Sequence, residues 1–190
     1  MLPRMMYLVL YITLLTGVVQ AEEQLSREYA RDAILKSKEI QAFRTAAYLT
    51  TRGCKKDLQD ITLRLRCVSS QGEKLGMWTA TPGMWTPTPN NAVNPVLTAK
   101  GQTLISHVNI WFINSFIKLI TPTMPSVQVT GIADSTGGAK RAEFSWEHKN
   151  LPQEIQPLVC GGIGQAIFQH YDDGWRVSSV EDTGPRSDCE

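Results

Sequence analysis

The sequence predicts an α+β protein in which a long N-terminal helix and a central apolar helix pack on a curved, mainly antiparallel sheet. Apolar residues recur at helical spacing over residues 24–50 and again over residues 95–120. From residue 127 onward, apolar and polar residues alternate as they do in strands. The chain has 190 residues, of which 42% are hydrophobic, so it is long enough to bury the core of a single domain.

Residues 1–21 have the layout of a secretory signal peptide. Arg4 is the only charged residue before Glu22, an apolar stretch follows it, and Ala21 completes a cleavage site of the small-x-Ala type. The alternative is an uncleaved anchor, but the apolar stretch is shorter than the roughly 20 residues that cross a bilayer. We therefore expect cleavage after Ala21, export to the periplasm or the exterior, and no stable membrane span in the mature chain.

The mature chain is expected to form one α+β domain over residues 22–182, followed by a polar C-terminal tail at residues 183–190. Cleavage removes one of the 19 basic residues and none of the 18 acidic ones, so the mature chain has no formal net charge. Proteins that bind nucleic acids usually carry a clear excess of positive charge. We therefore expect no nucleic-acid partner.

The four cysteines are expected to form two disulfides. An even number of cysteines in an oxidising compartment usually pairs. Of the three possible pairings we favour Cys54–Cys67 and Cys160–Cys189, because each joins neighbours in the chain. No Cys-x-x-Cys or His-x-x-x-His spacing occurs, so the sequence predicts no metal site and no cofactor.

The first helical pattern, over residues 24–50, is interrupted at residues 36–39, which allows two helices with a bend between them. Gly53 is a suitable residue to end this region. From Ile61 to Cys67, apolar residues alternate with polar ones, which predicts a strand whose arginines lie on a solvated face.

Residues 76–82 and 83–89 are near-duplicates, and each copy contains a Met-Trp pair. Their prolines and glycines exclude a helix or a central strand, so we expect an extended edge or a long loop. Trp78 and Trp85 are then candidate binding residues, because exposed tryptophans offer a large contact area at low entropic cost. The alternative is that both side chains cap the core, since tryptophan is rarely left exposed.

The central helix is expected over residues 95–120 and begins at an Asn94-Pro95 cap. From Val108 to Ile120, nine of 13 residues are apolar and cover nearly all sides of such a helix. A helix of this kind is buried centrally or covered by another surface.

The last third of the chain is expected to be an antiparallel sheet. Residues 127–132 and 141–149 alternate in polarity. An Asp-Gly turn at residues 173–174 connects residues 166–171 with residues 175–180, which predicts a hairpin.

The cluster His-Tyr-Asp-Asp at residues 170–173 could supply general acid–base chemistry. Neighbouring residues of a strand point to opposite faces, and both aspartates suit the turn, so we predict no catalytic residue here. His148, on the same predicted face as Phe144 and Trp146, is the better inward-facing candidate for binding. A lone inward histidine is, however, more often a hydrogen-bonded core residue. The glycines of residues 161–164 lack the following helix that a phosphate-binding loop requires.

Two resemblances to known groups of proteins follow from these patterns. Residues 129–134, residues 144–146 and the run Tyr-Asp-Asp-Gly-Trp-Arg-Val at residues 171–177 resemble the ends of uncharacterised exported bacterial proteins. The predicted order of elements is similar to that of the NTF2-like, or cystatin-like, α+β fold. This second resemblance implies a sheet that curls round helices and leaves a pocket, in a family of isomerases, dehydratases and non-catalytic binding modules.

The sequence favours an exported, non-enzymatic module that binds a protein, a peptide or a glycan, because it has a duplicated Met-Trp segment and no recognisable catalytic motif. This hypothesis predicts that Trp78 and Trp85 are partly exposed. The alternative is an NTF2-like enzyme or small-molecule-binding protein with an apolar pocket between the sheet and the central helix. That pocket would hold a polar group such as His148 or Tyr171.

Overall fold

The structure, a computed structural model, describes residues 24–54, 61–79, 92–93, 95–111 and 115–189. Strands make up more of these ranges than helices do. The helices are α1 (Arg27–Lys36), α2 (Ile40–Phe43), α3 (Ile61–Lys74) and α4 (Ala99–Gln102). The strands are β1 (Ala46–Leu49), β2 (Trp78–Thr79), β3 (Ala92–Val93), β4 (Val96–Leu97), β5 (Ile105–Trp111), β6 (Phe116–Leu119), β7 (Ser126–Asp134), β8 (Lys140–Glu147), β9 (Val159–Cys160), β10 (Gly162–Tyr171) and β11 (Gly174–Pro185).

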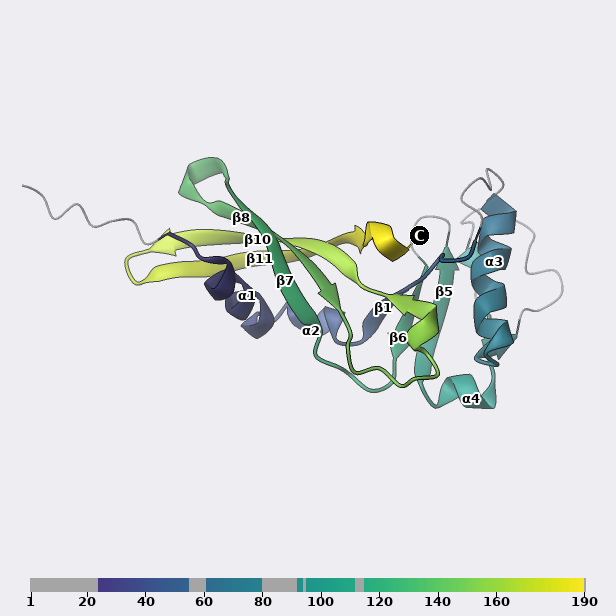
Figure 1. Cartoon of the computed structure of the whole chain (residues 1–190). Coiled ribbons are helices and arrows are strands. Elements are labelled where there is room, and N and C mark those ends of the chain that lie inside the picture. Colours follow the sequence, from purple (N-terminus) through teal and green to yellow (C-terminus); the bar gives the residue numbers. More distant parts are fainter. Residues whose placement is uncertain (1–23, 55–60, 80–91, 94, 112–114, 190) are drawn as a thin grey trace, which may run out of the picture.

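The strands form a five-stranded sheet in the order β3-β5-β6-β1-β9, a four-stranded sheet in the order β11-β10-β8-β7, and a two-stranded sheet of β2 and β4. Buried apolar residues form two separate clusters, one on each large sheet. We call the first part the α3 lobe; it comprises the five-stranded and two-stranded sheets with α3 and α4. The second part is the α1 lobe, in which α1 and α2 pack with the four-stranded sheet in one buried cluster. Figure 1 shows the two lobes at opposite ends of an elongated molecule.

Strand β1 contributes to both clusters. Ala47 and Leu49 are buried in the α3 lobe. Tyr48 points to the opposite face of the strand, as alternation requires, and packs on the α1-lobe cluster with its ring 5.8 Å from that of Trp146. Its hydroxyl donates a hydrogen bond of 2.6 Å to the carboxylate of Asp182 in β11. A single four-residue strand therefore connects the two cores.

The predicted fold class, with two long helices on a curved sheet, is wrong. The first predicted helix, over residues 24–50, is instead two short helices followed by β1. Helix α1 begins at Ser26, whose hydroxyl accepts a hydrogen bond from the Tyr29 backbone N–H, and ends where Ser37 adopts an extended conformation. The break expected at residues 36–39 is present. The apolar residues beyond it serve α2 and β1, however, and do not continue the helix.

The predicted central helix over residues 95–120 is also wrong, because the described residues there form β4, α4, β5 and β6. The hairpin of β5 and β6 is rich in β-branched side chains, which favour strands. A register shift between Ile105 and His107 lets Ile105 and Val108, three residues apart, both enter the core. This bulge reproduces the spacing of a helical face, which explains the error. The cone implied by the NTF2-like resemblance needs that helix, and the described elements do not form it.

The strand predicted from Ile61 to Cys67 is wrong as well, since this segment begins helix α3. The buried residues of α3 include Leu65, Val68 and Ser69, at the spacing of one helical face, whereas Leu63 is 42% exposed. The short alternating run imitates a strand because it lies within a longer pattern of helical period.

The antiparallel strands expected in the last third are present as β7, β8, β10 and β11. The predicted hairpin is confirmed: His170 pairs with Trp175, and Gly174 follows the turn at φ +115°, a conformation that favours glycine. Strand β11 continues to Pro185, so the sheet extends past residue 182, where we expected the domain to end. Residues 1–21, the predicted signal peptide, lie outside the described residues.

Both predicted disulfides are confirmed. The bond Cys54–Cys67 joins the segment after β1 to α3, and the bond Cys160–Cys189 joins β9 to the C-terminal end of the described chain. Each disulfide therefore connects two parts of the chain that belong to different elements or to the segments next to them.

Substitution of Gly72 tests the packing of α3 on Trp78. A Cβ at Gly72 would lie 2.0 Å from Cζ2 of Trp78, a ring that is fully buried. In an unpacked helix Gly→Ala is stabilising by about 1 kcal/mol, but overpacking a core costs about 1–3 kcal/mol. We expect Gly72→Ala to lower the free energy of unfolding in urea denaturation. Lys74→Ala, an exposed change in the same helix, should alter it by less than about 0.5 kcal/mol. A Gly72→Ala protein at least as stable as the wild type would contradict this packing.

Candidate functional site

A cleft with a volume of about 340 Å³ lies where the two lobes meet. Four parts of the chain form it: the segment after β1, the end of β8, the connection through β9 to β10, and the segment after β11. Its lining residues are Arg52, Glu147, His148, Lys149, Leu151, Gln156, Val159, Cys160, Gly161 and Arg186.

The C-terminal disulfide and a set of hydrogen bonds hold one wall of the cleft. The carbonyl oxygen of Cys189 accepts hydrogen bonds from the Thr51 backbone N–H at 2.7 Å and from the Thr50 hydroxyl at 2.9 Å. The Thr50 hydroxyl oxygen in turn accepts one from the Arg52 backbone N–H at 3.1 Å. The segment that carries Arg52 is therefore fastened to Cys189, which the disulfide fastens to Cys160 in β9.

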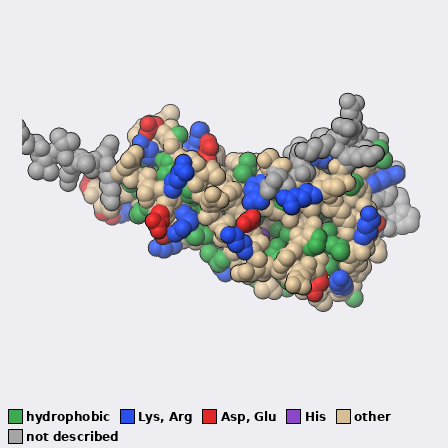
Figure 2. Space-filling model, viewed as in Figure 1, with side chains coloured by type: hydrophobic (Ala, Val, Ile, Leu, Met, Phe, Trp, Pro, Cys, Tyr) green, Lys and Arg blue, Asp and Glu red, His purple; other side chains and the backbone are tan. Residues whose placement is uncertain are grey.

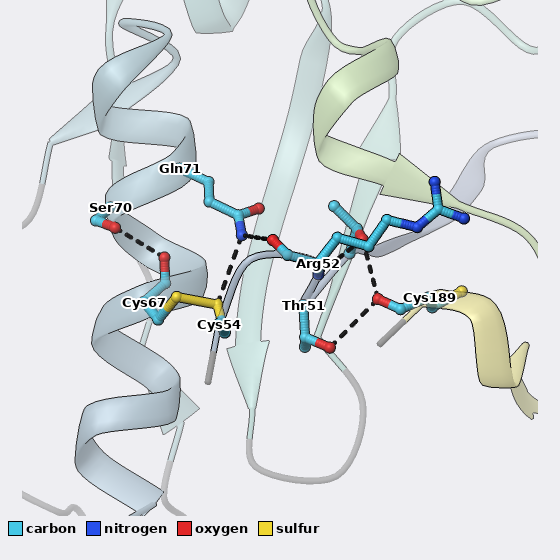
Figure 3. Close-up of a disulfide and its surroundings, with 8 residues drawn as sticks. Thr51, Arg52, Cys54, Cys67, Ser70, Gln71 and Cys189 are labelled. Atoms are coloured by element: carbon cyan, nitrogen blue, oxygen red, sulfur yellow. Dashed lines mark hydrogen bonds between the residues drawn. A yellow bond between two sulfur atoms is a disulfide. The ribbon is translucent and has the colours of Figure 1, made fainter. Parts of the chain in front are cut away.

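Helix α3 holds Arg52 from the other side (Figure 3). The side-chain amide of Gln71 donates a hydrogen bond of 2.8 Å to the Arg52 carbonyl oxygen and lies 3.5 Å from Cys54 Sγ. Figure 3 shows the Arg52 side chain extending away from α3, on the side of Cys189. The backbone of Arg52 is thus fixed at both its N–H and its carbonyl group, while its guanidinium reaches the cleft.

Three cations and one carboxylate lie among the described lining residues. Arg186 Nη1 donates to Glu147 Oε2 at 3.0 Å, and Lys149 Nζ lies 3.9 Å from Glu147 Oε1. Arg52 is the third cation. The formal charge of the whole chain is +1. Figure 2 shows Lys and Arg side chains over much of the visible face of the molecule, including its middle.

His148, predicted as a binding residue, lies in the wall of the cleft with both ring nitrogens in hydrogen bonds. Nε2 is 2.9 Å from the Ala46 carbonyl oxygen, which can only accept, so Nε2 carries the proton. Nδ1 then accepts from the Thr123 hydroxyl at 2.6 Å. Burial lowers the pKa of His148, although backbone hydrogen bonds to Ala46 and Phe43 oppose the shift. The neutral ring therefore connects the end of β8 to β1 and adds no charge to the cleft.

Trp78, the other described candidate, does not reach the cleft. It is 1% exposed within the α3-lobe core, and its indole N–H donates to the Ser69 carbonyl oxygen at 2.9 Å. The expectation that Trp78 is partly exposed is wrong, because Gly72 leaves room for its ring and Ser69 satisfies its polar atom. Trp85 lies outside the described residues.

Residues 170–173, the cluster considered for acid–base chemistry, lie at the turn between β10 and β11 in the α1 lobe. His170 packs edge-on against Trp175 with ring centroids 4.9 Å apart. Tyr171 is 46% exposed and donates its hydroxyl hydrogen to Gln169 Oε1 at 2.8 Å. The structure does not bring these side chains to His148.

The pocket expected between the sheet and a central helix is not formed by the described residues, since that helix is absent.

Sequence reasoning did not identify the three cations of the cleft. Arg52 lies two residues before Cys54, Arg186 lies three residues before Cys189, and Lys149 follows His148. The two arginines could have been predicted from their closeness to cysteines that were expected to pair. A disulfide also fixes the position of the residues next to it.

The cleft offers positive charge and hydrogen-bond donors. Its carboxylate, Glu147, is ion-paired, and the nitrogens of His148 are already bonded. No group of three or more His, Cys, Asp or Glu residues in the described ranges could hold a metal ion. Among the described lining residues, Lys149 and Arg186 are thus already in contact with a carboxylate of the chain itself.

Comparison of the chain with known protein families, curated proteins and solved structures finds no match. Within the described ranges, none of the helices is both long and apolar enough to cross a membrane. Two disulfides are compatible with an oxidising environment outside the cytoplasm.

The lowered pKa of His148 predicts that acid destabilises the protein. Above its ordinary pKa of 6.5 the imidazole is neutral in both the folded and the unfolded chain. Below that pH the unfolded chain binds the proton first, so stability is lost as the pH falls towards the folded-state pKa. We expect the free energy of unfolding in urea to decrease between about pH 7.5 and about pH 5.5. His148→Gln, which cannot titrate, should show a smaller decrease. Equal decreases in the two proteins would exclude this role of His148.

Proposed function

We propose that this protein is an exported, non-catalytic binding module that holds its partner in the cleft between the two lobes. The observation that carries the proposal is the convergence of Arg52, Lys149 and Arg186, from three separate segments, on one concave surface. Hydrogen bonds fix the backbones of Arg52 and Arg186 before a partner arrives, so less freedom is lost on binding, which favours affinity.

Export is the second part of the proposal. It is supported by the signal-like layout of residues 1–21 and by two disulfides, which persist in oxidising compartments. The disulfide Cys160–Cys189 also borders the cleft, so an oxidising compartment would supply the condition under which the cleft keeps its shape.

The partner is proposed to be a protein, a peptide or a glycan that inserts a small part of its surface. A volume of about 340 Å³ is at the lower end of the range of ligand pockets. It accommodates one or two side chains or sugar units and no larger body.

Site-specific photo-crosslinking in the native host tests both parts of the proposal. The full chain, with its own leader, would carry a benzoylphenylalanine either at Gln156 in the cleft or at Gln128, which is exposed on β7. After irradiation, we expect crosslinked partners in the exported fraction for the Gln156 position and not for Gln128. The crosslinked chain should begin at Glu22.

Two results would contradict the proposal. The absence of adducts at Gln156, or the same adducts at both positions, would exclude the cleft as the binding site. A chain that keeps residues 1–21 and stays in the cytoplasm would exclude export.

A further inference from the structure

The two ends of the Cys160–Cys189 disulfide differ in their surroundings. Cys160 is partly exposed and is one of the residues that line the cleft. Cys189 is 2% exposed and is not among the described lining residues. A molecule that enters the cleft therefore meets Cys160 and not Cys189.

The Cys54–Cys67 disulfide has a different position. Neither of its cysteines is among the described residues that line the cleft. Cys54 packs against the buried cluster of the α3 lobe, and Cys67 lies within α3. This second disulfide thus provides, in the same chain, a reference for thiol chemistry away from the cleft.

A disulfide at the wall of a cleft can exchange with a thiol that the cleft admits. The thiolate is the attacking form, and it reacts at a sulfur atom that it can reach. Attack on Sγ of Cys160 forms a new S–S bond there and breaks the bond to Cys189, whose sulfur leaves as a thiolate and takes a proton from water. One disulfide replaces another, so no oxidant or further reductant is needed.

The released Cys189 would stay beside Cys160, because other contacts hold it. Its carbonyl oxygen accepts hydrogen bonds from the Thr51 backbone N–H at 2.7 Å and from the Thr50 hydroxyl at 2.9 Å. Its Sγ lies 3.2 Å from the Gly161 carbonyl oxygen, which can accept a hydrogen bond from the free thiol. The exchange can therefore reverse without unfolding of this segment.

We propose that Cys160 is a site of thiol–disulfide exchange, at which a small thiol enters the cleft, forms a mixed disulfide and excludes the binding partner. The thiol is of the size of cysteine, because a cleft of about 340 Å³ accommodates only one or two side chains. The exclusion of the partner rests on the proposed function, since it regulates the same cleft. The exchange itself does not depend on a partner.

Acid trapping of the wild-type protein tests which sulfur is attacked. The mature, disulfide-bonded protein is incubated with an excess of L-cysteine that leaves it folded, quenched with acid and digested with pepsin. Exchange stops in acid because the thiolate is lost. By mass spectrometry we expect cysteinylation of Cys160 to exceed that of Cys189 by at least about tenfold.

Two matched variants compare the sulfurs directly. Cys189→Ser and Cys160→Ser break the same disulfide and leave one free thiol, at Cys160 or at Cys189. L-Cystine is the probe, because a free thiolate attacks it, forms a mixed disulfide and releases one cysteine. We expect Cys160 to be capped at least about tenfold faster than Cys189. If either variant is unfolded, the wild-type experiment decides alone.

Crosslinking at Gln156 tests the exclusion of the partner. Cys189→Ser protein with benzoylphenylalanine at Gln156 is incubated with the exported fraction of the native host, either with Cys160 free or with Cys160 capped by cysteine. We expect the capped protein to lose most of the crosslinked partners that the uncapped protein captures.

Three results would overturn the inference: no greater cysteinylation at Cys160 than at Cys189, cysteinylation of Cys54 or Cys67 while Cys160–Cys189 stays intact, or equal crosslinking with Cys160 free and capped. If Gln156 captures no partner even in the wild-type chain, the proposed function fails. Selective cysteinylation of Cys160 would still establish the exchange site in that case.

Discussion

The alternation of side chains along strand β1 is the constraint on which the arrangement of the molecule depends. Ala47 and Leu49 are buried in one core while Tyr48 reaches the other. Burial and the hydrogen bond to Asp182 raise the pKa of Tyr48 well above its usual value, so the phenol remains a donor. The carbonyl oxygen of Ala46 also accepts a hydrogen bond from the ring of His148 at the end of β8. The cleft is the space left at this junction, and its cations come from segments that β1 and the C-terminal disulfide hold in place.

The parts of the fold that could be predicted from the sequence are those with a local cause. The hairpin of β10 and β11 follows from an Asp-Gly turn between alternating runs, and the two disulfides follow from pairing neighbours in the chain. The prediction of a central helix was wrong because a bulge near Ile105 gives a strand the spacing of a helical face. The prediction of a strand at residues 61–67 was wrong because the short alternation of apolar and polar residues there lies inside the longer helical pattern of α3. In both cases pairing or packing with distant residues decided between two local patterns.

The candidate site was harder to predict from the sequence than the fold was. His148 was placed correctly on the face of Phe144 and Trp146, since its ring contacts Trp146, but its nitrogens serve the junction of the lobes. Arg52, Lys149 and Arg186 belong to no motif, and more than 130 residues separate the first from the last. Only the folded chain brings them to one surface, because their proximity depends on the pairing of β1 with β9 and on the C-terminal disulfide.

Native-state hydrogen exchange measured on Leu49→Ala tests the central role of β1 most directly. Removing this buried side chain from the α3-lobe core should cost about 2–5 kcal/mol. Since β1 connects the two cores, we expect the amides of β10, in the α1 lobe, to lose protection together with those of β5 in the α3 lobe. Faster exchange in β5 with wild-type protection in β10 would show that the two lobes unfold independently and would contradict this account.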